Sequence, residues 1–174
     1  MKLKLFESFI NESIDVYHGS TTRFKTFNLS KIGSGDGKSI GGWGIYFTDK
    51  KSVADGYYTT GGFVKKYKID DGPYFDLDDQ FYDDNFIEKL KKKKVKSSDL
   101  EEFKTDILGY PDTTNLQVYN WLSYVLGSKK KSSLFLDDLG YIGNKFEDRW
   151  ESGATNYVLF NPKYIITEIQ DDEC

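Results

Sequence analysis

Two short sequence boxes decide the fold: YHGS at residues 17–20 and GWGIYFTD at residues 42–49. Each box places an apolar run against glycines, which is typical of a strand that meets a tight turn. We therefore expect strands at residues 15–18 and 45–47. The segment at residues 33–42 is dense in glycine and predicts a flexible loop between them.

Outward from these boxes, the pattern predicts an α+β domain. A helix is expected near residues 50–58, and a helical insert at about residues 81–139. Apolar alternation predicts further strands at residues 63–69, 74–77, 141–146, 157–160 and 164–169. Strands on both sides of a helical insert favour two small antiparallel sheets with a cleft between them.

The length of 174 residues suits a single domain with its own core, which we place at residues 15–174. At the N-terminus, apolar residues at helical spacing predict an amphipathic helix over residues 1–14. Those residues are Leu3, Phe6, Ile10 and Ile14. We expect this helix to cap the domain, with a docking segment as the alternative. No stretch approaches the roughly 20 apolar residues that span a bilayer, so no membrane association is expected.

Inside the insert, the apolar residues of 118–125 form one helical face that ends at Gly127, a residue favoured just after a helix. Ser98 and Glu101 have the spacing of a capping box at a helix start. The lysine run at residues 91–94 is typical of a solvated helix face. The alternative is that these lysines steer an acidic protein or RNA acceptor into place.

Composition limits the chemistry. His18 is the only histidine and Cys174 the only cysteine, so a zinc site of the Cys/His kind is not expected. A lone cysteine forms no internal disulfide, which fits a reducing, cytoplasmic compartment. The formal net charge of −4 disfavours strong binding to a nucleic-acid backbone. Any reaction must therefore use carboxylates, amides, hydroxyls and one imidazole.

The stretch GSGDGKS at residues 33–39 imitates a nucleotide-binding P-loop but does not fit its pattern. That pattern needs four residues between its first glycine and the GKS, whereas Gly33 and Gly37 are separated by three. The residues after Ser39 are also a poor helix start, and a phosphate cradle needs helix amides facing the anion. ATP or GTP binding at this loop is therefore not expected.

The boxes resemble the His and Tyr motifs of diphtheria-toxin-like and poly(ADP-ribose)-polymerase-like ADP-ribosyltransferases. The resemblance is strongest to the branch found in phage polyvalent proteins, where Y-H-G-T/S and a glycine-rich loop precede G-W-G-L/I-Y-F, an A-x-x-Y helix and N-Y-V-V-F. This chain has Ala54 with Tyr57 and Tyr58, and NYVLF at residues 156–160. The likeness covers residues 15–78 and 134–169. Residues 81–133 match no known pattern.

The resemblance implies an enzyme with NAD as co-substrate and no metal. Gly19 would offer its backbone to the nicotinamide carboxamide, and a residue without Cβ allows that close approach. His18 and Ser20 would bond ribose hydroxyls. Tyr46 would form one wall of the nicotinamide pocket.

The same resemblance assigns the rest of the pocket. Tyr57 or Tyr58 would cover the nicotinamide ring from the side opposite Tyr46. Ala54 would leave room beside the ring, and Gly44 belongs to the same cofactor-binding box. The glycine loop at residues 33–42 would fold over the adenosine half as a flexible flap.

The chain departs from the family at one catalytic position. Many active members carry a glutamate at the start of a late strand, where its charge stabilises the sugar cation. Here that position is Asn156, which can bond a ribose hydroxyl but carries no charge and cannot act as a base. Glu151, in the loop just before, is the candidate that could compensate. The alternative for Glu151 is an ordinary solvated loop charge.

These observations favour a mono-ADP-ribosyltransferase that cleaves NAD and transfers ADP-ribose to a macromolecular acceptor, with a host protein favoured over RNA. The absence of a glutamate at this position favours a single transfer over polymer elongation. A phage or toxin-like effector acting in the bacterial cytosol would suit this activity. Two alternatives stay open: an NAD glycohydrolase without an acceptor, and a non-catalytic module that binds NAD or a protein.

Overall fold

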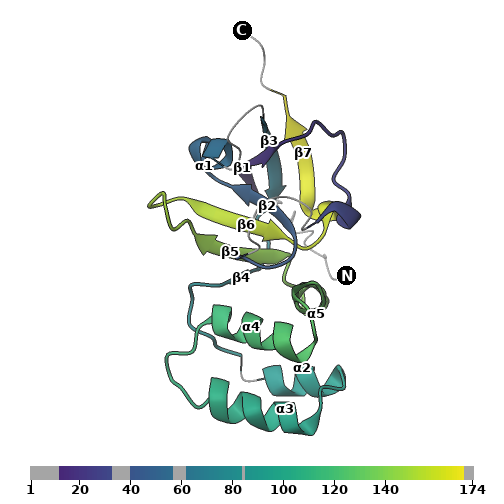
Figure 1. The fold of residues 1–174 in the computed structure, drawn as a ribbon, viewed down its shortest axis with the longest axis vertical. Coiled ribbons are helices and arrows are strands. Elements are labelled where there is room, and N and C mark those ends of the chain that lie inside the picture. The colour runs from purple at the N-terminus through teal and green to yellow at the C-terminus, as the bar shows by residue number, and fades with distance from the viewer. Residues whose placement is uncertain (1–11, 33–39, 57–61, 84, 171–174) are drawn as a thin grey trace, which may run out of the picture.

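The computed structural model describes residues 12–32, 40–56, 62–83 and 85–170. A sheet occupies one half of the molecule, and helices α2 to α5 stack at one end of it (Figure 1). The strands are β1 (Ser13–Ser20), β2 (Ile45–Thr48), β3 (Phe63–Asp70), β4 (Tyr74–Asp76), β5 (Gly143–Glu147), β6 (Thr155–Leu159) and β7 (Ile165–Ile169). Helix α1 (Lys51–Gly56) follows β2, and short 3-10 turns occur at η1 (Leu29–Lys31) and η3 (Pro162–Tyr164).

The strands form one seven-stranded sheet in the order β4-β5-β6-β2-β1-β3-β7. The expectation of two small sheets is therefore corrected to one sheet. The reason is that β1 pairs with β3 along one edge and with β2 along the other, which joins the two halves. Neighbouring strands are antiparallel except β4 and β5, which run parallel because the helical insert connects them instead of a hairpin turn.

The helical insert is confirmed between β4 and β5. It contains α2 (Phe86–Lys92), α3 (Ser97–Glu102), a π-helical turn η2 (Phe103–Ile107), α4 (Asn115–Val125) and α5 (Lys129–Asp138). The capping box expected at Ser98 is wrong, because α3 already includes Ser98 and its N-cap makes no side-chain bond. The capping box of the insert is formed by Thr114 and Gln117 at the start of α4. Gly127 follows that helix with a φ of +83°, as expected for its end.

Two apolar clusters hold these parts together. The sheet cluster consists of Val16, Ile45, Phe47, Tyr67, Ile69, Ile142, Tyr157 and Leu159. The insert cluster joins the helices to the β4–β5 end of the sheet through Phe75, Leu77 and Phe160. Since both halves contribute to the insert cluster, the insert is packed against the sheet and not merely tethered to it.

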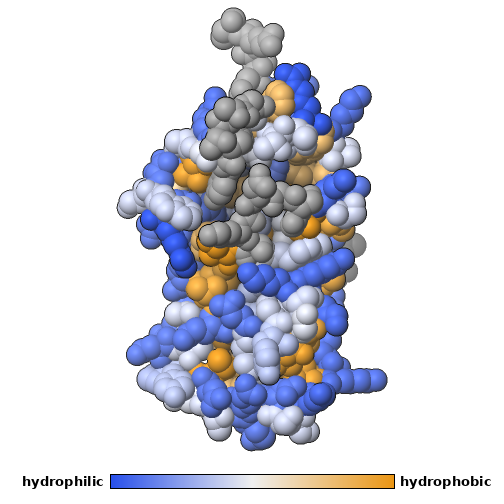
Figure 2. Space-filling model, viewed as in Figure 1, coloured by the Kyte–Doolittle hydropathy of each residue, from blue (hydrophilic) through white to orange (hydrophobic). Residues whose placement is uncertain are grey.

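The lysine run of residues 91–94 is exposed at the end of α2. Lys91 pairs with Glu88 at 2.6 Å, and Lys93 pairs with Asp138. Hydrophilic side chains cover much of this outer part of the insert (Figure 2). These contacts match a solvated helix face, and the steering of an acceptor by this run stays a prediction.

The N-terminal helix expected over residues 1–14 falls mostly outside the described residues. Its last apolar position, Ile14, belongs to β1 and pairs with Ile69 of β3. None of the described helices is both long and apolar enough to cross a bilayer.

Candidate active site

His18 is fixed where β1 meets β2. Its Nδ1 lies 2.7 Å from the backbone carbonyl oxygen of Tyr46. Three phenylalanine rings surround the imidazole, with centroids 5.0 to 5.6 Å away: Phe24, Phe27 and Phe47. The ring is therefore held both by a hydrogen bond across two strands and by packing.

The Tyr46 carbonyl determines the tautomer of His18. A carbonyl oxygen only accepts hydrogen bonds, so Nδ1 carries the proton and Nε2 of the neutral ring is left as an acceptor. Burial lowers the pKa of His18 below its ordinary value, and the bond to Tyr46 only partly opposes that shift. At neutral pH, His18 is thus a neutral ring with one acceptor nitrogen.

The sheet opens beside His18. Strand β1 registers with β3 at every residue of Ser13–Ser20, whereas its registered pairing with β2 is limited to Tyr17 with Thr48. Along this described stretch, the β2-facing edge of Gly19 and Ser20 therefore has no registered strand partner. The Ser20 hydroxyl donates to the carbonyl of Thr22 at 2.8 Å, which shapes the turn after the strand. An unpaired strand edge is suited to bonding a planar amide.

Tyr46 lies on β2 and donates its hydroxyl to the carbonyl oxygen of Gly42 at 2.7 Å. Gly44 is required by packing between strands, because a Cβ there would lie 2.5 Å from the Leu159 carbonyl oxygen. The backbone of Gly42 has a φ of +108°, a conformation that glycine adopts without strain. Gly44 thus allows β2 to pack closely against β6, and Gly42 allows the chain to turn before it enters β2.

The predicted residues that follow β2 are only partly described. Ala54 of α1 is buried, with 1% of its surface exposed, and its small side chain lets α1 approach the sheet closely. Tyr57 and Tyr58, expected to cover the pocket, lie outside the described residues.

Asn156 contacts a residue that the sequence analysis did not identify. Its Nδ2 donates to Oδ2 of Asp148 at 2.9 Å, and both side chains are buried. Oδ1 of Asp148 accepts the backbone N–H groups of Trp150 and Glu151 at 2.8 and 2.9 Å. The only local signal for this role is an aspartate placed to accept the backbone N–H two residues later, as at the start of a turn.

Glu151 is engaged with α1 and not with Asn156. The Ser52 hydroxyl shares its one proton between both carboxylate oxygens, each 2.8 Å away, and Lys50 Nζ lies 3.7 Å from Oε1. Its side chain is 38% exposed. Glu151 thus fastens the loop at residues 148–154 to the start of α1, and a catalytic role for it stays a prediction.

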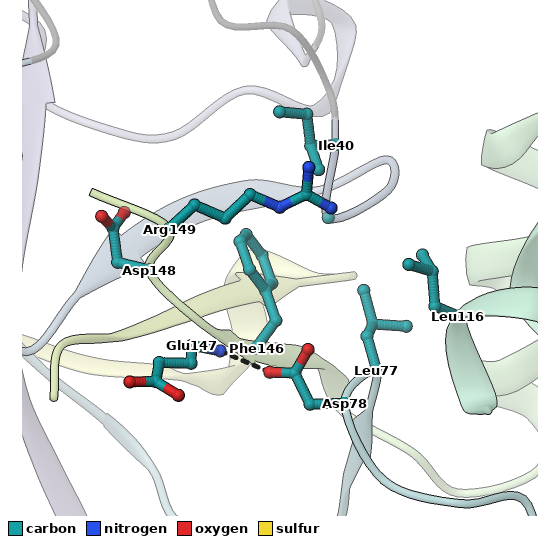
Figure 3. A pocket seen from close by; sticks show the side chains of 9 residues that line it. Ile40, Leu77, Asp78, Leu116, Phe146, Glu147, Asp148 and Arg149 are labelled. Atoms are coloured by element: carbon teal, nitrogen blue, oxygen red, sulfur yellow. Dashed lines mark hydrogen bonds between the residues drawn. The ribbon is translucent and has the colours of Figure 1, made fainter. Parts of the chain in front are cut away.

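A cavity of about 250 Å³ lies between the end of β5, the segment before β2 and helix α4 (Figure 3). Asp148 and Arg149 form part of its wall, and Leu116 contributes from α4. The Arg149 side chain extends toward Ile40 on the opposite side. The loop at residues 148–154 and the helical insert therefore both line this cavity.

The insert holds the segment that leads into β2. Tyr119 of α4 accepts the backbone N–H of Trp43 at 3.1 Å, and Ser133 of α5 donates to the Trp43 carbonyl at 2.8 Å. From β5, Asn144 donates to the Gly41 carbonyl at 2.7 Å. This role of the insert was not predicted, because each contact joins residues far apart in the sequence.

The comparisons with known proteins agree with these motifs. The sequence profile of the family described as ADP-ribosyltransferase in polyvalent proteins matches residues 12–170. The chain therefore belongs to this family, which makes it a transferase of the ADP-ribosyltransferase type. No curated protein and no solved structure matches the chain. Among the described residues, no cluster of histidine, cysteine or carboxylate side chains is arranged to hold a metal ion.

The lowered pKa of His18 predicts how stability depends on pH. As the pH falls below about 6.5, the unfolded chain binds a proton that the half-buried neutral ring resists, so the free energy of unfolding should decrease. His18→Gln should remove this decrease. Because the chain has a single histidine, its imidazole C–H signals in NMR report the same pKa directly. A measured pKa at or above 6.5 would contradict this assignment.

The Tyr119 contact predicts a stability effect. Tyr119→Phe leaves the Trp43 N–H without its acceptor and should lower the free energy of unfolding by about 1–3 kcal/mol. Urea unfolding measures the change. Tyr124→Phe is the matched control, since Tyr124 lies on the same helix and is 77% exposed. Equal stability of both variants would show that the Tyr119 hydroxyl does not help to hold this segment.

Proposed function

We propose that this chain is a mono-ADP-ribosyltransferase that cleaves NAD and transfers ADP-ribose to a macromolecular acceptor, with a host protein favoured over RNA. The observation that carries the proposal is the place where β1 and β2 separate after the single registered pair Tyr17 with Thr48, which we call the seam. There, a neutral His18 ring stands beside the unregistered backbone edge of Gly19. Membership of the transferase family supports the same conclusion.

The seam suits the nicotinamide half of NAD. The backbone edge of Gly19 would pair with the carboxamide, as one strand pairs with the next. His18 Nε2 would accept a hydrogen bond from a ribose hydroxyl, since its Nδ1 already donates to the Tyr46 carbonyl. The Tyr46 ring would form one wall, and either Tyr57 or Tyr58 the other. Fixing the carboxamide and the ribose in this way orients the bond to be broken.

The reaction breaks the bond between C1′ of the ribose and the nicotinamide nitrogen. Nicotinamide leaves with the bonding electron pair, so positive charge develops on the sugar, as in glycoside cleavage. A nucleophile of the acceptor then bonds to C1′ and releases its proton. Asn156 cannot take that proton, because its amide is not a base. A single transfer to a nucleophilic acceptor fits this site better than polymer elongation.

The acceptor surface is proposed at residues 148–154, the loop before β6. Trp150 in this loop is 80% exposed, and an exposed tryptophan on a loop next to a site is typical of protein contacts. The net charge of −4 argues against a nucleic-acid acceptor. On the family resemblance and the lone cysteine, we place this activity in the cytosol of a bacterial host, as part of a phage-encoded or toxin-like effector.

Two alternatives would use the same seam. An NAD glycohydrolase would release free ADP-ribose and modify no protein. A non-catalytic module would gain thermal stability with NAD but release no nicotinamide over hours, and the neutral Asn156 favours this alternative more than any other feature does. Measuring nicotinamide, free ADP-ribose and modified protein in one reaction separates the three.

Labelled NAD with a bacterial lysate should yield a labelled protein band, and mass spectrometry should locate an added ADP-ribose. His18→Ala and Tyr46→Ala should each reduce labelling roughly tenfold or more, because each removes a pocket contact of about 1.5–3 kcal/mol. Tyr124→Ala, at an exposed tyrosine of the insert, is the control and should label normally. Undiminished labelling by folded variants of both His18 and Tyr46 would refute the proposal.

Trp150→Ala should separate acceptor recognition from NAD binding. We expect protein labelling to fall roughly tenfold, since exposed aromatic anchors at interfaces often contribute 2 kcal/mol or more. The rate of nicotinamide release without an acceptor should stay unchanged. Parallel assays of labelled protein and nicotinamide measure both quantities. Equal losses in the two assays would mean that Trp150 serves the fold or NAD binding instead.

A further inference from the structure

Asn156 lies near the start of β6, within the late NYVLF motif of this chain, and its side chain lies against a carboxylate. Asn156 Nδ2 and Asp148 Oδ2 are 2.9 Å apart. The two residues are only 1% and 6% exposed. A hydrogen bond to an ionised group between two side chains of such low exposure is stronger than a neutral one.

The Asp148 carboxylate is held in its charged form. Burial raises its pKa, but the bonds from Asn156 and from the N–H groups of Glu151 and Trp150 outweigh burial, so the net shift of the pKa is downward. The backbone N–H of Asp148 also donates to the Ala154 carbonyl at 2.8 Å, which closes the base of the loop. The negative charge is therefore permanent at neutral pH and fixed in position.

This contact orients the Asn156 amide. Because its NH₂ group donates to Asp148, its carbonyl oxygen points away from that carboxylate. Asn156 is in register with Thr48 of β2, two residues after Tyr46, so Asn156 and Tyr46 emerge on the same face of the sheet. On that face Asn156 lies next to Tyr46, the proposed pocket wall, along the β2–β6 pairing.

We propose that Asp148 is a positioning residue that acts through Asn156. Its charge keeps the Asn156 carbonyl oxygen available to accept a ribose hydroxyl, and its field stabilises the cationic sugar at short range. The sugar would thereby contact the neutral Asn156 amide, which is itself hydrogen-bonded to the Asp148 carboxylate. This inference rests on the proposed function.

The test is Asp148→Asn, assayed by nicotinamide release from NAD. Asparagine at 148 keeps an oxygen that accepts the N–H groups of Trp150 and Glu151, so the loop cap is retained. It removes the charge and places an NH₂ group against Asn156, which forces the Asn156 amide to turn over. We expect kcat to fall roughly tenfold or more, with KM for NAD changed less than about threefold and the melting temperature nearly unchanged.

Asp83→Asn is the matched control. Asp83 is also mostly buried, with 14% of its side chain exposed. It accepts the backbone N–H of Asn85 two residues later at 3.0 Å, as Asp148 accepts that of Trp150. It lies in the helical insert, so its variant should keep the wild-type kcat. A loss of kcat in both variants would overturn the proposal, because the effect would then not be specific to Asn156.

The exchange variant, Asp148→Asn with Asn156→Asp, moves the carboxylate to position 156 and retains a carboxylate–amide pair. It should recover much of the lost kcat, and it carries the test alone if the single variant does not fold. A folded Asp148→Asn protein with the wild-type kcat, or a folded exchange variant without activity, would overturn the inference. If the wild-type chain releases no nicotinamide, the proposed function itself has failed and this inference with it.

Discussion

The hydrogen bond of 2.7 Å from His18 to the Tyr46 carbonyl crosses the point where the two halves of the sheet meet. Only the pair Tyr17 with Thr48 registers there, so this side-chain bond supplements a short strand pairing. Strands β1 and β2 separate beyond this pair, which leaves the backbone of Gly19 without a partner residue in β2, and the bond from His18 to the Tyr46 carbonyl limits how far they separate. A neutral imidazole suits this place, because it bridges the strands at Nδ1 and keeps Nε2 as an acceptor.

The helical insert holds the segment that leads into the same strand. Tyr119 and Ser133 bond both backbone groups of Trp43, and the Tyr46 hydroxyl bonds the neighbouring Gly42 carbonyl. The backbone that enters β2 is thus satisfied largely by side chains of distant elements. This explains why the segment can be rich in glycine, which loses more conformational entropy on folding than any other residue, and still be well defined.

The sequence predicts the parts of this fold that local pattern controls. The apolar run of β2, the glycines around it and the helical face that ends at Gly127 are all local features, and the structure agrees with them. The joining of the two halves of the sheet through β1 was not predictable, because the alternation of apolar and polar residues along a strand does not determine which strand pairs with it. Nor was the contact of Tyr119 with Trp43, because the two residues are 76 positions apart. Asp148 was missed because an aspartate before a turn usually only caps it.

The contacts around Asn156 form a closed path. Strand β2 leads into α1, Ser52 of α1 bonds Glu151, and the Glu151 N–H bonds Asp148. Asp148 then bonds Asn156, which pairs with Thr48 and returns the path to β2. A loop fastened at both ends can hold a charge in a fixed place at little entropic cost when the ligand binds. The same loop carries the exposed Trp150, so an acceptor that shifts this loop would also shift the Asp148 charge. Recognition of the acceptor and stabilisation of the sugar cation would therefore be mechanically coupled through Asp148.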